Sequence, residues 1–168
     1  TILVADTNVQ DFPSSERLVN VSKSCVRVAR LFGFDPKVAF LSHSTFGKPI
    51  SKNTKHVRDA IQALKKEKVD FDFDGEMQPD VALNPIYQEI YPFSKIVGNA
   101  NILIMPALHS AAISTKLMKV FGGGKLIGPL LIGLGLPIEV APLRASTSEI
   151  LNLASIASYS SDVIDYSN

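Results

Sequence analysis

Short apolar runs alternate along this chain with stretches that have the period of a helix. The strand-like runs are residues 2–5, 37–41, 69–73 and 102–105, and weaker ones follow at 130–132 and 138–141. The helix-like stretches are residues 14–32, 52–68, 110–121 and 146–159, with a broken helix over 79–91. Strands that alternate with helices in this way predict an α/β fold with a mainly parallel sheet and helices on both faces.

The first helical stretch shows the clearest pattern. Its apolar residues are spaced by three and four and form one stripe: Leu18, Val21, Cys25, Val28 and Phe32. Ser14 or Ser15 is expected to cap its start, and Gly33 to end it. Cys25 lies on the apolar stripe, so we expect a buried core thiol and not a nucleophile.

Composition excludes several classes of protein. The 168 residues carry a net charge of +1, which gives no reason to expect nucleic acid or an anionic membrane as a partner. One cysteine excludes an internal disulfide and a multi-cysteine metal site, and it suits the cytoplasm. The most apolar run, residues 126–143, is interrupted by glycine and proline, so it is not expected to span a membrane. The chain begins at Thr1 directly in a strand-like run, and we expect it to be a fragment of a longer, multidomain protein.

Charged residues alternate with apolar ones in the third strand-like run and just after it. Asp70, Asp72 and Asp74 occupy every second position, which is the period of a strand with one side facing water. Gly75 is expected to end this strand and to place Glu76 in a turn. In α/β proteins the carboxyl end of a strand is where a ligand site is expected.

A polar loop, residues 42–49, follows the second strand. Its small and hydroxyl-bearing residues are Ser42, Ser44, Thr45 and Gly47, and Lys48 adds a positive charge. Hydroxyls, free backbone N–H groups and an ammonium can together hold phosphate or carbonyl oxygens, so a phosphate-bearing ligand is a candidate here. The outer face of the next helix carries six basic residues, which indicate either a solvated surface or a phosphate-binding one: Lys52, Lys55, Arg58, Lys65, Lys66 and Lys68.

Three other patterns do not support a function. Residues 70–75 mimic half of a calcium-binding EF-hand loop, but Val81 stands where that loop needs a bidentate glutamate. The glycines at 122–124 follow a helix and precede a strand, which indicates a helix end and a tight turn, whereas a phosphate-binding loop opens a helix. The three histidines are scattered, so no metal site is expected, and no G-x-S-x-G motif supports a hydrolase.

Four motifs occur in a fixed order along the chain. They are Ser42-x-Ser44-Thr45-x-Gly47, Asp74-Gly75-Glu76-x-Gln78-x-Asp80-x-Ala82, Gly98-x-Ala100-Asn101-x-Leu103-Ile104-x-Pro106 and Gly128-Pro129-x-x-x-Gly133. Together they resemble the phosphate acetyl/butyryltransferase family. The resemblance implies a phosphotransacetylase-like fold, the lobe type of the isocitrate and isopropylmalate dehydrogenases, with residues 1–168 forming the C-terminal half of that family's domain.

Details of the motifs are closer to one branch, the phosphotransacetylase-like domain at the C-terminus of bacterial NADP-dependent malic enzymes. These details are residues 42–47, 75–77 and 81–84, and the three glycines at 122–124, which are followed by Ile-Gly-Pro at 127–129. The resemblance implies a domain that binds acetyl-CoA and regulates a malic enzyme, which converts malate and NADP to pyruvate, carbon dioxide and NADPH. It implies no cofactor in this chain itself, whereas NADP and a divalent metal are expected in the rest of the protein.

The site of the true phosphotransacetylases is altered in this sequence. That family carries a Ser-Arg-Gly run followed by an Asp before the last helix, for the acetyl carbonyl, the phosphate and the CoA thiol. Here Pro142 and Leu143 fall on the serine and arginine positions, and Glu149 falls on the position of the base. Arg144 comes one place late. Glu149 and Arg144 are therefore expected to be catalytic only if transferase activity survives.

The polar loop and the resemblance together assign a set of ligand-binding candidates: Ser42, Ser44, Thr45, Gly47, Lys48, Asp74, Glu76, Asn101, Lys116 and Ser146. For Asp72, Asp74 and Glu76 we favour helix capping and hydrogen bonds between lobes over ligand contact. The main alternative function is an active phosphate acetyltransferase that moves acetyl between CoA and phosphate. A third is a dimerisation domain without a ligand, because dimers or higher homo-oligomers are usual in the resembled family.

Overall fold

A computed structural model describes residues 1–5, 9–122, 125–134 and 136–163 of the chain. The chain forms two units, residues 1–115 and residues 116–168. The glycines at 123 and 124, which are part of the resemblance described above, lie outside the described residues. No helix in the described part of the chain has the length and apolar character that crossing a membrane requires.

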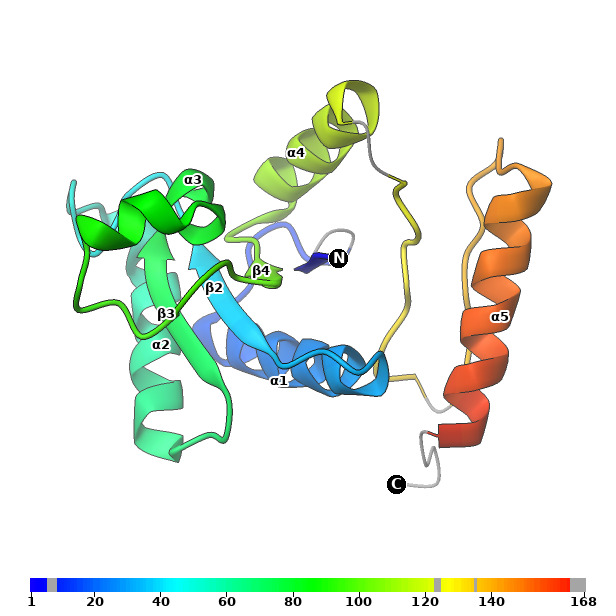
Figure 1. Ribbon diagram of the computed structural model, residues 1–168, viewed down its shortest axis with the longest axis horizontal. Helices are drawn as coiled ribbons and strands as arrows, with labels where there is room; N and C mark the ends of the chain where they lie inside the picture. Colours follow the sequence, from blue (N-terminus) through cyan, green and yellow to red (C-terminus); the bar gives the residue numbers. More distant parts are fainter. Residues whose placement is uncertain (6–8, 123–124, 135, 164–168) are drawn as a thin grey trace. The chain divides into compact units, whose positions relative to one another are not determined.

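The first unit is built on a four-stranded sheet in which every pair of neighbouring strands is parallel (Figure 1). The strands are β1 (Leu3–Ala5), β2 (Lys37–Leu41), β3 (Asp72–Met77) and β4 (Ile102–Ile104). They lie side by side in the order β1-β4-β2-β3, so the last strand in the sequence pairs between the first two. The predicted α/β fold with a parallel sheet is confirmed.

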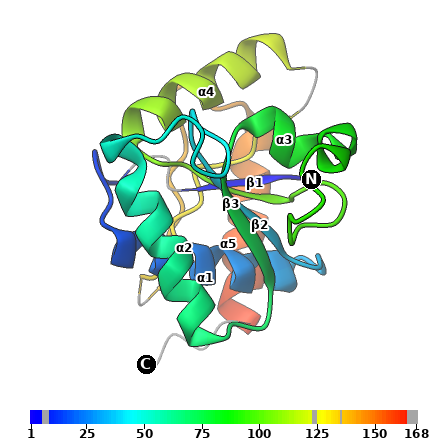
Figure 2. The ribbon, with the colours of Figure 1, turned by 90° about the vertical axis from the view of Figure 1, so that its left-hand side faces the viewer.

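Helices cover both faces of this sheet (Figure 2). They are α1 (Ser15–Leu31), α2 (Lys55–Glu67), α3 (Pro79–Leu83) and the start of α4 (Leu108–Phe121), with the 3-10 helices η1 (Lys52–Thr54) and η2 (Pro85–Glu89). Val38 and Phe40 of β2 pack against α1 and α2. Ala39 and Leu41 point to the opposite face, as alternation along a strand requires, and pack with α3 and the start of α4.

The start of the first helix follows the prediction. Ser14 caps α1, because its Oγ accepts a hydrogen bond from the backbone N–H of Arg17 at 3.1 Å. Gly33 lies just past the helix end with a φ of +76°, a backbone conformation that favours glycine. Cys25 is buried in the core between α1, α2 and the sheet, as expected for a structural thiol.

The third strand differs from the prediction. We predicted a strand over 69–73 that ends at Gly75, but β3 begins at Asp72 and continues through Gly75 to Met77. Phe40 lies opposite Gly75 and Leu41 lies opposite Met77, so Glu76 is an extra residue in a bulge. The prediction of one side facing water is wrong at Asp74, which is buried because β3 is covered on both sides there.

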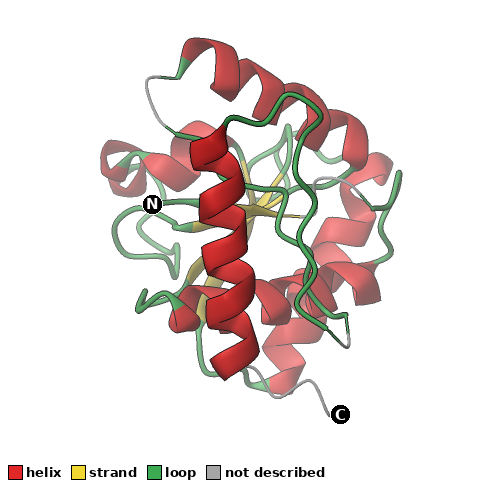
Figure 3. Ribbon diagram, turned by 90° about the vertical axis from the view of Figure 1, so that its right-hand side faces the viewer, coloured by secondary structure: helices red, strands yellow, loops and turns green. Residues whose placement is uncertain are grey.

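The second unit contains the end of α4 and helix α5 (Thr147–Val163), joined by a long loop (Figure 3). The predicted strands at 130–132 and 138–141 are wrong, since a single antiparallel bridge between Leu130 and Glu139 is all that forms there among the described residues. Proline stands directly before each run, at 129 and 137, and the backbone N–H of Leu131 donates to the Glu139 side chain at 3.3 Å, so these positions supply no backbone donor to a ladder between the two runs.

Candidate functional site

The carboxyl ends of three strands bring the predicted ligand loop to one edge of the sheet. β2 leads into residues 42–49, β3 leads into Gln78, and β4 leads towards Pro106. The chain leaves the neighbouring strands β2 and β4 towards opposite faces, since α2 packs on one face and α4 on the other. Such a switch point is where ligands bind in open α/β sheets. His56 of α2 connects the two sides, with its Nε2 2.9 Å from the carbonyl oxygen of Pro106.

Residues 45–48 form a tight hairpin turn within this loop. Thr45 and Lys48 exchange two backbone hydrogen bonds, both of 3.1 Å. Phe46 and Gly47 have φ angles of +48° and +82°, the combination of a two-residue hairpin turn. The ring of Phe46 packs on Tyr91 and on Phe93, with centroids 5.3 and 4.8 Å away. The turn therefore has one defined shape, which leaves Lys48 exposed at its end.

A buried polar network lies beneath the turn. The Oγ of Ser44 donates to Oε1 of Glu76 at 2.9 Å, and Nη1 of Arg58 lies 3.2 Å from the same oxygen. Ser42 Oγ lies 3.2 Å from Ser44 Oγ. Ser44 and Glu76 are 0% and 1% exposed. The structure thus brings Ser42, Ser44 and Glu76 together, but as supports under the loop and not on its surface.

Asp74 also forms hydrogen bonds within the chain. Its Oδ2 accepts from the backbone N–H of Lys95 at 2.8 Å, and its Oδ1 accepts from that of Gly75 at 2.9 Å. Neither Asp74 nor Glu76 caps a helix, because their partners are backbone groups of loop and strand or side chains of Ser44 and Arg58. The preference for helix capping was therefore wrong for these two carboxylates.

Two predicted ligand residues stand in different surroundings. Thr45 is at the carboxyl edge, where its Oγ1 accepts from the backbone N–H of Gln78 at 3.2 Å. Asn101 precedes β4 and lies at the amino edge of the sheet. There its Oδ1 accepts from Lys37 N at 2.8 Å and its Nδ2 donates to the carbonyl oxygen of Asp35 at 2.7 Å. The structure does not bring Asn101 together with the ligand loop.

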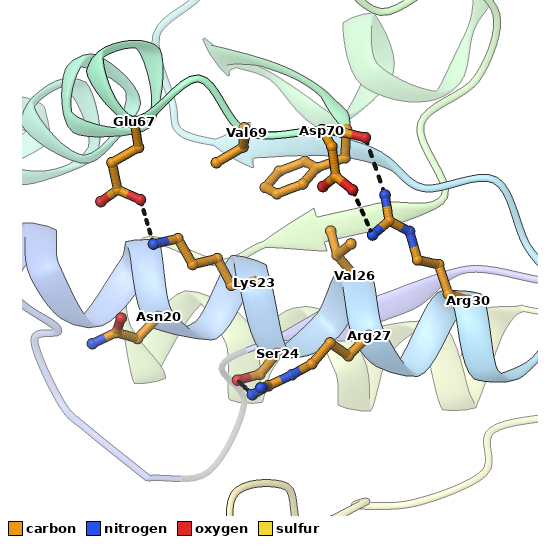
Figure 4. A pocket seen from close by; sticks show the side chains of 10 residues that line it. Asn20, Lys23, Ser24, Val26, Arg27, Arg30, Glu67, Val69 and Asp70 are labelled. Carbon is orange, nitrogen blue, oxygen red and sulfur yellow. Dashed lines mark hydrogen bonds and ion pairs between the residues drawn. The ribbon is translucent and has the colours of Figure 1, made fainter. Parts of the chain in front are cut away.

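A cavity of about 530 Å³ on the first unit lies away from this edge, between α1 and residues 67–71 (Figure 4). Two ion pairs cross it, one between Lys23 and Glu67 and one between Arg30 and Asp70 at 3.1 Å. The hydrogen bond from Arg30 holds the pKa of the Asp70 carboxyl below its ordinary value. Since these charges already satisfy one another, the cavity is a weaker candidate for a ligand than the carboxyl edge.

In the second unit, Ser146 and Glu149 form a capping box at the start of α5. Glu149 Oε2 accepts from the backbone N–H and the Oγ of Ser146 at 2.7 and 2.8 Å, and Ser146 Oγ accepts from the N–H of Glu149 at 3.3 Å. These bonds hold the pKa of the Glu149 carboxyl below its ordinary value, and the nearby Lys119 and Lys125 add to the effect. The Ser-x-x-Glu spacing is a sequence signal for this arrangement that our sequence reasoning missed.

Comparison with known proteins identifies the family. Residues 1–158 match the sequence profile of the phosphate acetyl/butaryl transferases. The chain belongs to this family. The resemblance predicted from the four motifs is thereby confirmed.

Its similarity to family members covers only part of their length. The chain is 47% identical over 95% of its own length to an NADP-dependent malic enzyme of Rhizobium meliloti, of which it spans 21%. It is 34% identical to a phosphate acetyltransferase of Clostridium acetobutylicum, of which it spans 47%. A solved phosphotransacetylase of Streptococcus pyogenes superposes with a TM-score of 0.88 at 31% identity, over 95% of this chain and 49% of that one. The predicted similarity to malic enzymes is confirmed.

Arg144 and Glu149, which the family resemblance connects with catalysis, lie in the second unit, as does Lys116, a predicted ligand residue. Arg144 and Lys116 are exposed, and no acidic side chain among the described residues forms an ion pair with either. Glu149 is engaged by Ser146 as described above. The described residues also contain no group of three or more His, Cys, Asp or Glu side chains that could hold a metal ion.

Replacing Ser146 with alanine is expected to destabilise α5 by about 1 kcal/mol, the usual loss for a serine N-cap. The effect should depend on pH. Because the folded state lowers the pKa of Glu149, the contribution of this carboxylate is present above its ordinary value of 4.5 and is lost as the pH falls through the folded value. Urea unfolding at neutral pH and at about pH 3 measures both effects, and the difference between variant and wild type should shrink in acid.

Ser155→Ala is the control for this prediction. Ser155 lies inside α5 and its Oγ donates only to the carbonyl oxygen of Leu151. Alanine at such a position should be neutral or slightly stabilising at both pH values. Equal losses in the two variants would show that the capping box contributes nothing.

Proposed function

We propose that this chain is an acetyl-CoA-binding regulatory domain of an NADP-dependent malic enzyme, with little or no transferase activity of its own. The proposal is supported by the 47% identity to part of such an enzyme over 95% of the chain. NADP, a divalent metal and the oxidative decarboxylation of malate to pyruvate would then belong to the rest of that protein. The cytoplasm is the compartment we propose for it.

The state of Glu149 is the observation that favours regulation over group transfer. This residue falls on the position of the base, yet two hydrogen bonds from Ser146 hold its carboxylate in a helix cap. A carboxylate with a lowered pKa is a weaker proton acceptor for the CoA thiol. Pro142 and Leu143, on the positions of the catalytic serine and arginine, offer neither a hydroxyl nor a guanidinium.

Regulation requires only a modest difference in ligand affinity between two states of the whole protein. Coupling of about 1–3 kcal/mol changes an affinity roughly 5- to 150-fold. We assign the anionic part of acetyl-CoA to the loop at the carboxyl edge, where Lys48 is exposed and the hairpin turn is well defined.

The second candidate is an active phosphate acetyltransferase, which the 34% identity to such an enzyme favours. In that reaction the CoA sulfur attacks the carbonyl carbon of acetyl phosphate, the C–O bond to phosphate breaks, and inorganic phosphate leaves. Glu149 would accept the thiol proton, and Arg144 would bind the phosphate. Both routes are compatible with a homodimer or higher oligomer. Ile150 and Leu151 of α5 are apolar residues that lie exposed, and they support such an assembly.

The test uses the full-length protein that contains this chain. We expect acetyl-CoA to change the rate of malate-dependent NADPH formation by at least about 5-fold, the lower end of typical coupling. When CoA and acetyl phosphate are added to the same protein, no acetyl phosphate should be consumed. Acetate at the same concentration serves as the control, since it has the acetyl group but not the anionic carrier.

Other outcomes select other functions. Turnover of acetyl phosphate without an effect on malate oxidation would identify a transferase. No effect and no turnover would leave an oligomerisation domain. Either result contradicts the regulatory proposal.

A further inference from the structure

Glu76 needs a charged partner because it is almost completely buried. It is 1% exposed and lies in the bulge of β3, below the ligand loop. Removing a carboxylate from water is costly unless hydrogen bonds and an opposite charge compensate for it. Ser44 provides a hydroxyl donor, and Arg58 provides the only guanidinium or ammonium within ion-pair distance of it among the described residues.

Arg58 reaches Glu76 from α2 and uses both ends of its guanidinium. Nη1 donates to Glu76 Oε1 at 3.2 Å and also to Thr54 Oγ1. Nη2 donates to the carbonyl oxygen of Ser51 at 2.8 Å. One side chain therefore joins the start of α2, the residues before it and β3. A lysine in its place would keep the charge but could not make this fork of bonds.

The ligand loop is connected to this ion pair at two points. Ser44 Oγ donates to the carboxylate of Glu76, and the backbone N–H of Phe46 donates to the carbonyl oxygen of Glu76 at 2.7 Å. Ser44 and Phe46 flank Thr45, where the hairpin turn that ends at Lys48 begins. The position of Glu76 therefore determines where the exposed end of the loop lies.

We infer that Arg58 is a positioning residue for the acyl-CoA site: by holding Glu76 it keeps the loop 42–49 in the shape that binds the ligand. This inference rests on the proposed function. Arg58 does not contact the ligand in this scheme; three of its five N–H donors are used by Glu76, Thr54 and Ser51. In the sequence Arg58 is one of six basic residues on the outer face of a helix. The structure distinguishes it by its ion pair with the buried carboxylate of Glu76.

The test compares variants of the full-length protein. Arg58→Met should raise the acetyl-CoA concentration that gives half of the effect on malate oxidation by about 10-fold, a typical size for a mutation that alters coupling without touching the ligand. Adding Glu76→Gln should restore most of the response, because an amide needs no cationic partner and its oxygen can still accept from Ser44. Lys55→Met is the matched control. It removes one charge from the same helix, and in the described part of the chain Lys55 pairs with exposed Asp59 alone.

Two results would overturn the inference. If Arg58 touches the ligand phosphates, the double variant will remain as weak as Arg58→Met. If Arg58 only stabilises the fold, Arg58→Met will lower the melting temperature and leave the half-effect concentration unchanged. Should methionine prevent folding, Arg58→Lys provides the same measurement, because it keeps the charge and loses the fork.

Hydrogen exchange separates this inference from the proposed function. Amides of residues 44–48 should exchange faster in Arg58→Met, or in Arg58→Lys, than in Lys55→Met, and should be protected again in the double variant, all without any ligand. If wild type does not respond to acetyl-CoA, the regulatory function fails whatever Arg58 does. If wild type responds but exchange in the loop is unchanged, positioning by Arg58 is wrong while the function stands.

Discussion

Replacing Gly75 with alanine is expected to lower the free energy of unfolding by about 3–5 kcal/mol, because backbone strain and overpacking add at one position. Gly75 lies in β3 with a φ of +143°, a backbone conformation that residues with a side chain rarely adopt. An added Cβ would lie 2.7 Å from the carbonyl oxygen of Phe40 and 3.0 Å from its Cβ. Phe40 is fully buried in the central strand β2, so it has no room to move away. Urea unfolding of the 168-residue chain measures the loss.

Gly33→Ala is the matched control for Gly75→Ala. Gly33 has a φ of +76°, but nothing lies within 4 Å of the position of its added Cβ. It therefore reports the conformational cost alone, about 1 kcal/mol. If the two variants lose the same stability, the close approach of β2 and β3 at Gly75 has no energetic weight, and the bulge is more adaptable than the structure indicates.

The order of elements could be predicted from the sequence, because β1, β2 and β4 are short apolar runs and α1 and α2 carry the apolar period of a helix. The stripe of α1 and the run that forms β2 are local patterns that tertiary contacts do not change. The path of β3 could not be predicted in the same way. A glycine within a charged and apolar alternation is compatible with a strand end or with a bulge, and only the pairing of Phe40 with Gly75 decides between them.

The candidate site was predicted in part. The loop 42–49 was located correctly at a carboxyl edge, since the preceding strand and the loop composition are both local signals. The ion pair of Arg58 with buried Glu76 could not be predicted, because no spacing separates Arg58 from the other basic residues of its helix, and Glu76 is 18 positions away. The assignments of Lys48, Lys116 and Asn101 to ligand contact stay predictions, and so does a catalytic role of Arg144 and Glu149 if transferase activity survives.

Replacing Asp74 with alanine is expected to destabilise the chain by about 2–4 kcal/mol, since a hydrogen bond to a charged group contributes about 1.5–3 kcal/mol. Its two oxygens hold the backbone N–H groups of Lys95 and Gly75. Alanine leaves both donors without this acceptor and frees the segment before β4 from β3. Urea unfolding is again the measurement, and Asp72→Ala is the matched control, because Asp72 lies on the same strand but is exposed.

The control should change stability by no more than about 0.5 kcal/mol, as is usual for an exposed side chain. A comparable loss in both variants would mean that burial of Asp74 carries no special weight. The same pair of variants also decides whether Asp74 belongs to the ligand site. A residue that only contacts acetyl-CoA would alter the response of the full-length protein and leave unfolding unchanged. If Asp74 only supports β3, its replacement lowers the free energy of unfolding. The response to acetyl-CoA then changes only as far as the strand displaces Glu76 and, with it, the loop 42–49.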